Sequence, residues 1–400
     1  MKTYIVAAKR TAIGKFLGSL SGFGAGELGA KVVKNILEES RIDVNTIDQV
    51  IVGNVLGAGQ GQGIARQVAI KAGVPHHVPA WGVNMVCGSG MKCVMLGCTE
   101  IATGNADIII SGGVESMSNT PFMLGSALRN GQKMGDFKAV DHMVFDGLTD
   151  IFNNYHMGIT AENVADKYSI SRKAQDDFAY TSQQKAIKAV DSGAFDKEIV
   201  PVELVSKKET ILFQTDEYPN RASTPDKLAA LKPAFKKDGT VTAGNASGVN
   251  DGASFVMIMS EKKVKELGIT PLAEVISYGQ GGVAPEIMGL GPVPAIRQAL
   301  NQAGMKLDQI DILELNEAFA AQSLGVVEEL CTEHSVSKEW IFERTNINGG
   351  AIALGHPIGA SGNRILVTLV HALYANNKEY GLASLCIGGG MGTAIVIKRC

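Results

Sequence analysis

The stretch Asn348-Gly-Gly-Ala-Ile-Ala-Leu-Gly-His-Pro-Ile-Gly-Ala-Ser-Gly362 places a histidine between glycine-dense turns, and Cys386-Ile-Gly-Gly-Gly-Met-Gly392 follows it in the same hydrophobic segment. A third such element, Asn84-Met-Val-Cys-Gly-Ser-Gly90, lies far upstream. Glycine lets the backbone approach a ligand closely. The three stretches offer Cys87, His356 and Cys386 as reactive groups. Two thiols and one imidazole indicate acyl chemistry through a thioester.

The chain around these stretches predicts an α/β fold built from two similar halves. Short β-rich runs such as Gln49 to Val52 and Ile310 to Leu313 alternate with helical patterns such as Glu27 to Glu39, which is typical of a parallel-rich sheet covered by helices. Each half has the same series. A glycine-rich turn leads into an apolar helix and then into a strand that ends in glycine, and this repetition indicates an internal duplication.

The residues between about Thr120 and Gly248 have no counterpart in the other half and are richer in charge and in turns. They include a helix predicted from Ser171 to Asp191, capped by Ser171 and stopped by Gly193. Such an insertion is a natural place for substrate recognition. We therefore expect a first half formed by 1–119 and 249–270, a loop domain at 120–248, and a second half at 271–400.

The composition restricts the class of protein. The 400 residues are 45% hydrophobic and 19% charged, which is enough to bury a large core and argues against disorder. A net charge of −3 argues against a nucleic-acid binder, which needs a basic surface. No apolar stretch reaches the ~18 residues that span a bilayer, so we expect no membrane partner and a cytoplasmic location.

Neither a metal site nor a nucleotide loop is predicted. The six cysteines contain no Cys-x-x-Cys pair and no cluster at metal-ligand spacing. The glycines of Gly24 to Gly29 match a dinucleotide pattern but stand too far from the preceding strand. Gly57 to Gly63 lacks the Gly-Lys-Ser/Thr ending of a phosphate-binding loop. We read Cys93, Cys98 and Cys331 as small buried residues and Cys400 as an exposed terminal thiol.

Four motifs in this order make the sequence resemble the thiolase family along essentially its whole length. They are Asn84 to Gly90, Asn-Glu-Ala-Phe-Ala at Asn316 to Ala320, Gly355 to Gly362, and Cys386 to Gly392. Each motif alone is weak, but four in order are highly specific. The resemblance implies the thiolase fold, in which two duplicated α/β halves form αβαβα layers and a loop domain is inserted.

The subclass resembles the short-chain acetyl-CoA C-acetyltransferases of that family, because Asp146 to Asp150 and Tyr155 to Gly158 match their loop domain. The implied reaction is the reversible Claisen condensation of two acetyl-CoA to acetoacetyl-CoA and CoA through an acetyl-cysteine. The implied partners are acetyl-CoA, acetoacetyl-CoA and CoA, with the coenzyme A thioester as substrate and no permanently bound cofactor. The family also implies a homo-oligomer, commonly a dimer of dimers.

The chemistry assigns a role to each reactive group. Cys87 is the expected nucleophile, because it precedes a helix whose N-terminus favours the thiolate. His356 is expected to take its proton, with a pKa near the operating pH. Cys386 is the expected base for the second acetyl group, with an ordinary thiol pKa of about 8.5. By resemblance, Asn316 holds a water that forms one oxyanion hole with His356, and the N–H groups of Cys87 and Gly388 form the other.

The resemblance also implies a channel for coenzyme A. Arg221 is the expected adenine or phosphate contact, because a guanidinium both stacks and pairs. Ser223 is carried over with a possible shift to Thr224. The channel residues implied by the family are Leu148, His156, Met157, Arg221, Ser223, Ala243, Ser247, Met288, Ala318 and Phe319.

Three alternatives remain open at this stage. A degradative 3-ketoacyl-CoA thiolase uses the same residues on longer substrates, although His156 is generally absent from that group. A non-catalytic acyl-CoA or lipid carrier has no need of all four polar groups, Cys87, His356, Cys386 and Asn316. A ketoacyl synthase typically uses two histidines, whereas this chain has His356 and Cys386.

Overall fold

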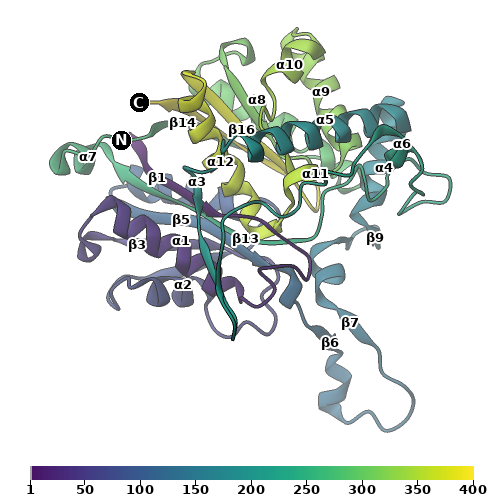
Figure 1. The fold of residues 1–400 in the computed structure, drawn as a ribbon, viewed down its shortest axis with the longest axis horizontal. Coiled ribbons are helices and arrows are strands. Elements are labelled where there is room, and N and C mark those ends of the chain that lie inside the picture. Colours follow the sequence, from purple (N-terminus) through teal and green to yellow (C-terminus); the bar gives the residue numbers. More distant parts are fainter. Residues whose placement is uncertain (1) are drawn as a thin grey trace.

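The computed structural model describes residues 2–400 and shows an α/β fold from which one hairpin projects (Figure 1). Along the main sheet the strands follow the order β15 (Ile312–Leu315), β16 (Tyr380–Ile387), β17 (Met391–Arg399), β14 (Ala273–Gly282), β1 (Thr3–Thr11), β13 (Asn250–Ser260), β5 (Ile108–Ser116), β3 (Gln49–Gly53) and β4 (Ala80–Val83). Strands of the second half precede β1 in this order, and strands of the first half follow it. The two halves join where Thr3 to Ile5 of β1 pair with β14.

Helices lie on both faces of these strands and form the expected layers. The first half is covered on its outer face by α1 (Ala25–Ser40) and α2 (Ile64–Ala72). The second half is covered on its outer face by α8 (Pro292–Ala303), α9 (Ala320–His334) and α10 (Lys338–Arg344). Between the two sets of strands lie α3 (Ser89–Ala102) and α12 (Ile358–Ala375). The prediction of an αβαβα fold is therefore confirmed.

The alternation of side chains along buried strands explains these layers. In β5, Ile108 and Ile110 pack into the outer core beside α1 and α2, whereas Ile109 packs into the central core beside α3 and α12. In β16, Leu382 faces the outer core and Leu385 faces the central one. Because both faces of each strand are covered, the strands are continuous apolar runs in the sequence.

The duplication is visible in matching polar contacts. Asp48 Oδ2 accepts hydrogen bonds from the N–H groups of Asp107 and Ile108, at the start of β5, at 2.7 and 2.9 Å. Asp311 Oδ2 accepts hydrogen bonds from the N–H groups of Glu379 and Tyr380, at the start of β16, at 3.0 and 2.9 Å. One carboxylate in each half thus fixes the first residues of the neighbouring parallel strand.

The inserted segment carries its own helices and hairpins. The predicted capped helix is α5 (Arg172–Asp191), and Ser171 Oγ accepts a hydrogen bond from Ala174 N. The hairpin that projects in Figure 1 contains β6 and β7. The elements of the segment are β6 (Phe122–Leu124), β7 (Ala139–Asp141), β8 (Thr149–Asp150), β9 (Tyr155–His156), α4 (Met157–Tyr168), α5, β10 (Ile199–Val200), β11 (Val202–Val205), β12 (Thr210–Phe213) and α6 (Pro225–Ala229).

Between this segment and the second half, β13 returns to the first half, and α7 (Glu261–Leu267) follows it. Since β13 pairs with both β1 and β5, we propose the division into 1–119 plus 249–270, 120–248 and 271–400 as the domain boundaries. None of the helices within residues 2–400 is long and apolar enough to cross a membrane.

The central helices approach neighbouring backbone at glycines. A Cβ on Gly113 of β5 would lie 2.0 Å from the carbonyl oxygen of Gly359 in α12. A Cβ on Gly90 of α3 would lie 2.9 Å from the same oxygen. The N-terminal turns of α3 and α12 therefore meet backbone to backbone, and no larger residue fits at Gly113 without moving α12.

We expect Gly113→Ala to lower the free energy of unfolding by roughly 1–3 kcal/mol, because the added methyl group overpacks this contact. Gly125→Ala is the matched control, since a Cβ there meets nothing within 4 Å and its φ is −62°. Urea unfolding monitored by circular dichroism measures both variants. Equal stabilities of the two variants would contradict the proposed contact.

Candidate active site

Cys87 lies on a tight turn between β4 and α3. Val86 has a φ of 45°, which is a strained conformation for a β-branched residue and is typical of functional turns. Ser89 Oγ accepts a hydrogen bond from Met85 N at 2.9 Å and donates one to Val86 O at 2.7 Å. This one hydroxyl closes the turn on both sides, so the sulfur of Cys87 stands at the N-terminus of α3.

His356 lies on the turn before α12, and its ring is held in one tautomer. Ser361 Oγ lies 2.6 Å from His356 Nδ1 and donates its own hydrogen to Pro357 O at 2.9 Å. Nδ1 must therefore carry the hydrogen that it shares with Ser361. His356 Nε2 is buried and finds no hydrogen-bond partner within residues 2–400, so it is free to accept a proton.

A cavity of about 320 Å³ brings together side chains from all three parts of the chain. The predicted residues that line it are Cys87, Leu148, His156, Met157, Ala243, Ser247, Met288, Ala318, Phe319, His356, Cys386 and Gly388. Cys87 comes from the first half, whereas His356 and Cys386 come from the second. The three reactive groups predicted from separate glycine-rich turns thus face one space.

Burial changes the acid–base properties that were expected of these groups. Burial raises the pKa of the Cys87 thiol to about 11, although the N–H groups of Gly388 and Cys87 lower it in part. Burial, and then the charge of Arg364, lower the pKa of His356 to about 4, so the imidazole is neutral at pH 7. Burial also raises the pKa of the Cys386 thiol.

These directions correct three expectations. The helix N-terminus does not by itself make Cys87 a thiolate, because desolvation of the charged form is the larger effect. The pKa values of His356 and Cys386 do not lie near neutrality, for the same reason. The resting site therefore holds two thiols and one neutral imidazole, and a proton must move before either sulfur reacts.

Asn316 follows β15 and is 1% exposed. Its backbone N–H donates to Ser384 O at 3.0 Å, but neither Oδ1 nor Nδ2 of the side chain has a partner within residues 2–400. A buried amide usually needs a partner, and ordered water is a common one. The side chain does not line the cavity described above, so its expected water stays a prediction.

The apolar end of the cavity is built around His156. His156 Nδ1 accepts a hydrogen bond from Gly158 N at 3.0 Å, and its ring stacks on Phe235 with centroids 4.6 Å apart. Phe235 in turn meets Phe319 edge to face at 6.2 Å. Burial lowers the pKa of His156, so the ring is neutral and its hydrogen sits on Nε2.

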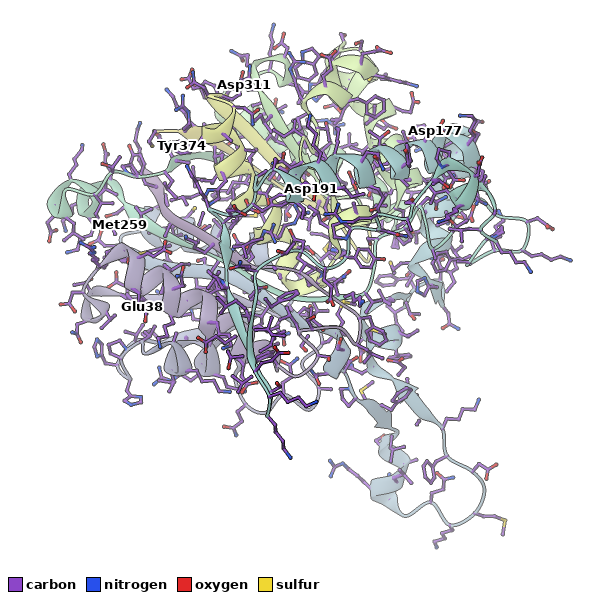
Figure 2. All side chains as sticks on the ribbon, viewed as in Figure 1. Glu38, Asp177, Asp191, Met259, Asp311 and Tyr374 are labelled. Carbon is purple, nitrogen blue, oxygen red and sulfur yellow. The ribbon has the colours of Figure 1, made fainter. Side chains whose placement is uncertain are left out.

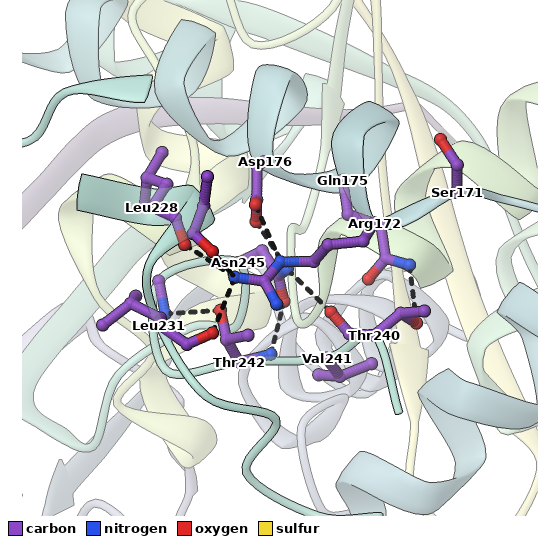
Figure 3. Close-up of polar contacts among 12 residues, drawn as sticks. Ser171, Arg172, Gln175, Asp176, Leu228, Leu231, Thr240, Val241, Thr242 and Asn245 are labelled. Carbon is purple, nitrogen blue, oxygen red and sulfur yellow. Dashed lines mark hydrogen bonds and ion pairs between the residues drawn. The ribbon is translucent and has the colours of Figure 1, made fainter. Parts of the chain in front are cut away.

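The segment that carries Ala243 and Ser247 is held against α5 by polar contacts (Figure 3). Asn245 Nδ2 donates to Asp176 Oδ1 at 2.9 Å, and Asp176 Oδ2 accepts from Arg172 Nε at 2.7 Å. Gln175 Nε2 donates to Thr240 Oγ1 at 2.9 Å. These side chains fix one wall of the cavity to α5, within the loop domain.

Two of the predicted coenzyme A residues lie outside this cavity. Ser223 lines an adjoining cavity of about 750 Å³, which shares Tyr218 and Ala243 with the first. Arg221 lines neither cavity. Its guanidinium Nη1 donates to Asp191 Oδ2 at 3.0 Å, and both side chains are more than half exposed. Asp191 is the last residue of α5 (Figure 2). To contact a ligand, Arg221 would have to leave this exposed ion pair.

Sequence reasoning missed several lining residues. Phe235 and Tyr218 belong to segments of the loop domain that carry no motif, so no pattern marked them. The lining residues that were not predicted are Val86, Met117, Gly147, Tyr218, Ala234, Phe235, Ala246, Gly248, Val249 and Ile358.

Glu317 was also missed, although it lies inside a recognised motif. Its Oε1 accepts from Asn346 Nδ2 at 2.8 Å, and its Oε2 accepts from Ser182 Oγ at 2.6 Å and from Ile352 N at 3.3 Å. Ile352 is the second residue of the short helix α11 (Ala351–Leu354), which leads directly to His356. This buried carboxylate therefore ties the Asn316 turn, the His356 turn and α5 together.

We expect alkylation of Cys87 by iodoacetamide to accelerate about tenfold per pH unit from pH 7 to 9.5, because only the thiolate reacts and the pKa is about 11. The exposed Cys400 is replaced by serine so that it does not consume reagent. Peptide mass spectrometry follows the rate at Cys87. A plateau below pH 8 would show that the thiolate already exists near neutrality.

Comparisons with known proteins agree with this architecture. The family model described as "Thiolase, N-terminal domain" matches residues 3–262, and "Thiolase, C-terminal domain" matches residues 269–399. An acetyl-CoA acetyltransferase of Pseudomonas aeruginosa is 54% identical, covering 99% of this chain and 98% of that protein. One from Escherichia coli is 53% identical with the same coverage.

Two solved structures are also similar over the whole chain. The acetyl-CoA acetyltransferase from Syntrophomonas wolfei has a TM-score of 0.97 at 43% identity and covers 100% of this chain and 99% of its own. The human mitochondrial 3-ketoacyl-CoA thiolase has a TM-score of 0.94 at 43% identity with the same coverage. The chain belongs to the thiolase family.

Proposed function

We propose that the protein is an acetyl-CoA C-acetyltransferase, an acyltransferase that condenses two acetyl-CoA reversibly to acetoacetyl-CoA and CoA. The observation that carries this proposal is the meeting of Cys87, His356 and Cys386 in one small cavity. Relatives that are 50–54% identical along the chain and carry the name acetyl-CoA acetyltransferase support the short-chain substrate.

In the first half-reaction, Cys87 attacks the acetyl carbonyl carbon while His356 Nε2 takes the thiol proton. The bond from that carbon to the CoA sulfur breaks, and the leaving CoA thiolate takes the proton of Cys386. The products are acetyl-Cys87, free CoA, an imidazolium and a Cys386 thiolate. The neutral resting state of His356 supports its role as the first base.

In the second half-reaction, the Cys386 thiolate removes a methyl proton from a second acetyl-CoA. The resulting carbon attacks the acetyl group on Cys87, which forms the new carbon–carbon bond. The Cys87 sulfur then leaves and takes back the proton from His356. Because burial raises the pKa of Cys386, its thiolate is a stronger base than an ordinary thiolate once it has formed.

The two oxyanions need donors that are already in place. We assign one site to His356 Nε2 and a water held by Asn316, whose buried amide is otherwise unpartnered within residues 2–400. We assign the other to the N–H groups of Cys87 and Gly388, which lower the pKa of the Cys87 thiol and so favour a negative charge beside it. One donor of this kind is typically worth about 3 kcal/mol in the transition state.

Coenzyme A is assigned to the two cavities that share Tyr218 and Ala243. The inner cavity is mainly apolar and suits the pantetheine arm. The outer one contains Ser223 and the cations Lys15 and Lys227, which suit the charged nucleotide end. We treat coenzyme A as a substrate that arrives and leaves, with no permanently bound cofactor.

We also propose a homo-oligomer, as a dimer of dimers, in the cytoplasm. β4 ends the main sheet with one unpaired edge, and the β6–β7 hairpin exposes Phe122, Leu124, Met134 and Phe137. Open sheet edges and projecting apolar side chains are common contact surfaces. A reducing compartment keeps catalytic thiols free, which supports the location.

Cys87→Ala is expected to lower acetyl exchange between acetyl-CoA and free CoA by at least about 10³-fold, because no acyl-enzyme can form. Cys331→Ala on α9 is the control, since that thiol lies outside the catalytic cavity. Incorporation of labelled CoA into acetyl-CoA measures the exchange. Exchange by Cys87→Ala at the wild-type rate would disprove the acetyl-cysteine route.

We expect thiolysis of acetoacetyl-CoA to exceed that of 3-ketodecanoyl-CoA by at least about tenfold in kcat/KM, because His156, Phe235 and Phe319 fill the apolar end of the cavity. Initial rates at varied substrate concentrations give both constants. A preference for the longer substrate would favour a degradative 3-ketoacyl-CoA thiolase. Absence of thiolysis with either substrate would favour a carrier.

A further inference from the structure

A third cavity, of about 530 Å³, lies between α5, α9 and α10 and shares no lining residue with the catalytic cavity. Its walls are mainly apolar, and its volume is typical of small-molecule sites. The apolar residues that line it are Ala174, Phe178, Leu315, Leu324, Val327 and Phe342. The proposed reaction makes no use of this space.

Two polar side chains in this cavity, Lys185 and Ser323, are available to a ligand. Lys185 Nζ donates to Thr345 O at 2.9 Å and to Phe342 O at 3.5 Å, and within the described part of the chain no carboxylate accepts a hydrogen bond from it. Burial lowers the pKa of its ammonium. Ser323 is 6% exposed, and its Oγ has no hydrogen-bond partner in residues 2–400. Among the described residues the buried hydroxyl has no partner, and the half-buried ammonium has two carbonyl acceptors but no paired carboxylate, so both can meet an anionic ligand.

We propose that this cavity binds a small carboxylate with an apolar body. The carboxylate accepts hydrogen bonds from Lys185 Nζ and Ser323 Oγ, and the hydrocarbon part covers Phe178, Leu324 and Phe342. A charge-assisted hydrogen bond in an apolar site is among the stronger polar contacts. Glu317 and Glu314 act on Lys185 only at longer range, and the ligand supplies a carboxylate in direct contact with its ammonium.

The acidic groups around the cavity are already engaged. Asp177, on α5 (Figure 2), pairs with Lys173 at 2.6 Å, and Glu343 on α10 pairs with Arg344 at 3.6 Å. The carboxylate of Glu317 is held by the donors of Ser182, Asn346 and Ile352. These carboxylates are directed to other partners, and Lys185 keeps its capacity to bind an anion.

Glu317 connects this site to the catalytic one. It lines the third cavity, follows Asn316 directly, and accepts a hydrogen bond from Ile352 N of α11, ahead of His356. A ligand that shifts the side chain of Glu317 therefore changes the positions of both the Asn316 turn and the His356 turn. We expect such a ligand to change kcat without competing with acetyl-CoA.

Octanoate is the probe, and isothermal titration calorimetry on the full chain saturated with CoA measures its binding outside the catalytic cavity. We expect one octanoate per chain, at least about tenfold weaker binding in Lys185→Met, and retained binding in Lys185→Arg. Lys188→Met, on the exposed side of α5, is the matched control and keeps wild-type affinity. Ser323→Leu fills the cavity and is expected to abolish binding.

Octan-1-ol has the same chain length as octanoate but no charge, so it measures what the apolar body contributes alone. It is expected to bind more weakly to the wild-type chain than octanoate does. Octanoate that bound Lys185→Met and Ser323→Leu as tightly as the wild-type chain would overturn the proposal. So would octanoate binding that disappeared when CoA was present. Calorimetry measures binding and does not depend on turnover. If the chain had no acetyltransferase activity, the proposed function would be refuted, but octanoate binding could still be tested.

Discussion

The backbone contact between the turns at the start of α3 and α12 determines where the reactive groups lie. Cys87 and His356 each lie two residues before the first residue of these helices, so the distance between the helices sets the distance between the two side chains. Gly90, Gly113 and Gly359 permit this approach because they carry no Cβ. The glycine-rich motifs are therefore needed for packing between the halves as much as for access to a ligand.

The sequence predicted the layers, the duplication and the convergence of Cys87, His356 and Cys386, because each rests on local patterns or on motifs in a fixed order. It did not predict the protonation states. The pKa of a thiol or an imidazole depends on how much protein surrounds it, and a motif does not record that. Cys87, His356 and Cys386 all shift toward their neutral forms for this reason.

The contacts made by the loop domain were the hardest to predict. Phe235 and Tyr218 reach the cavity from irregular segments, where no periodicity relates position to direction. For Arg221 a contact was predicted that the structure does not contain. The family resemblance implies a contact with coenzyme A, whereas in the structure its guanidinium pairs with the exposed Asp191. Ion pairs between exposed side chains contribute little energy, so this one is no strong barrier to a different role. Glu317 was overlooked since its partners, Ser182 and Ile352, are distant in sequence.

The pairing of β5 with β13 has a consequence for how such chains change. The two strands run antiparallel from Ile108 opposite Met259 to Ser116 opposite Asp251, so residues 117–250 are, in topology, the enlarged loop of a single hairpin. Doubling the length of a flexible loop costs only about 0.6 kcal/mol in closure entropy. Closure entropy therefore sets little limit on the length of this segment, whereas the pairing of β10 with β1 and the ion pairs of Arg10 with Glu198 and Asp216 tie part of it to the sheet. Substrate selectivity can diversify there while the framework that aligns the two thiols stays the same.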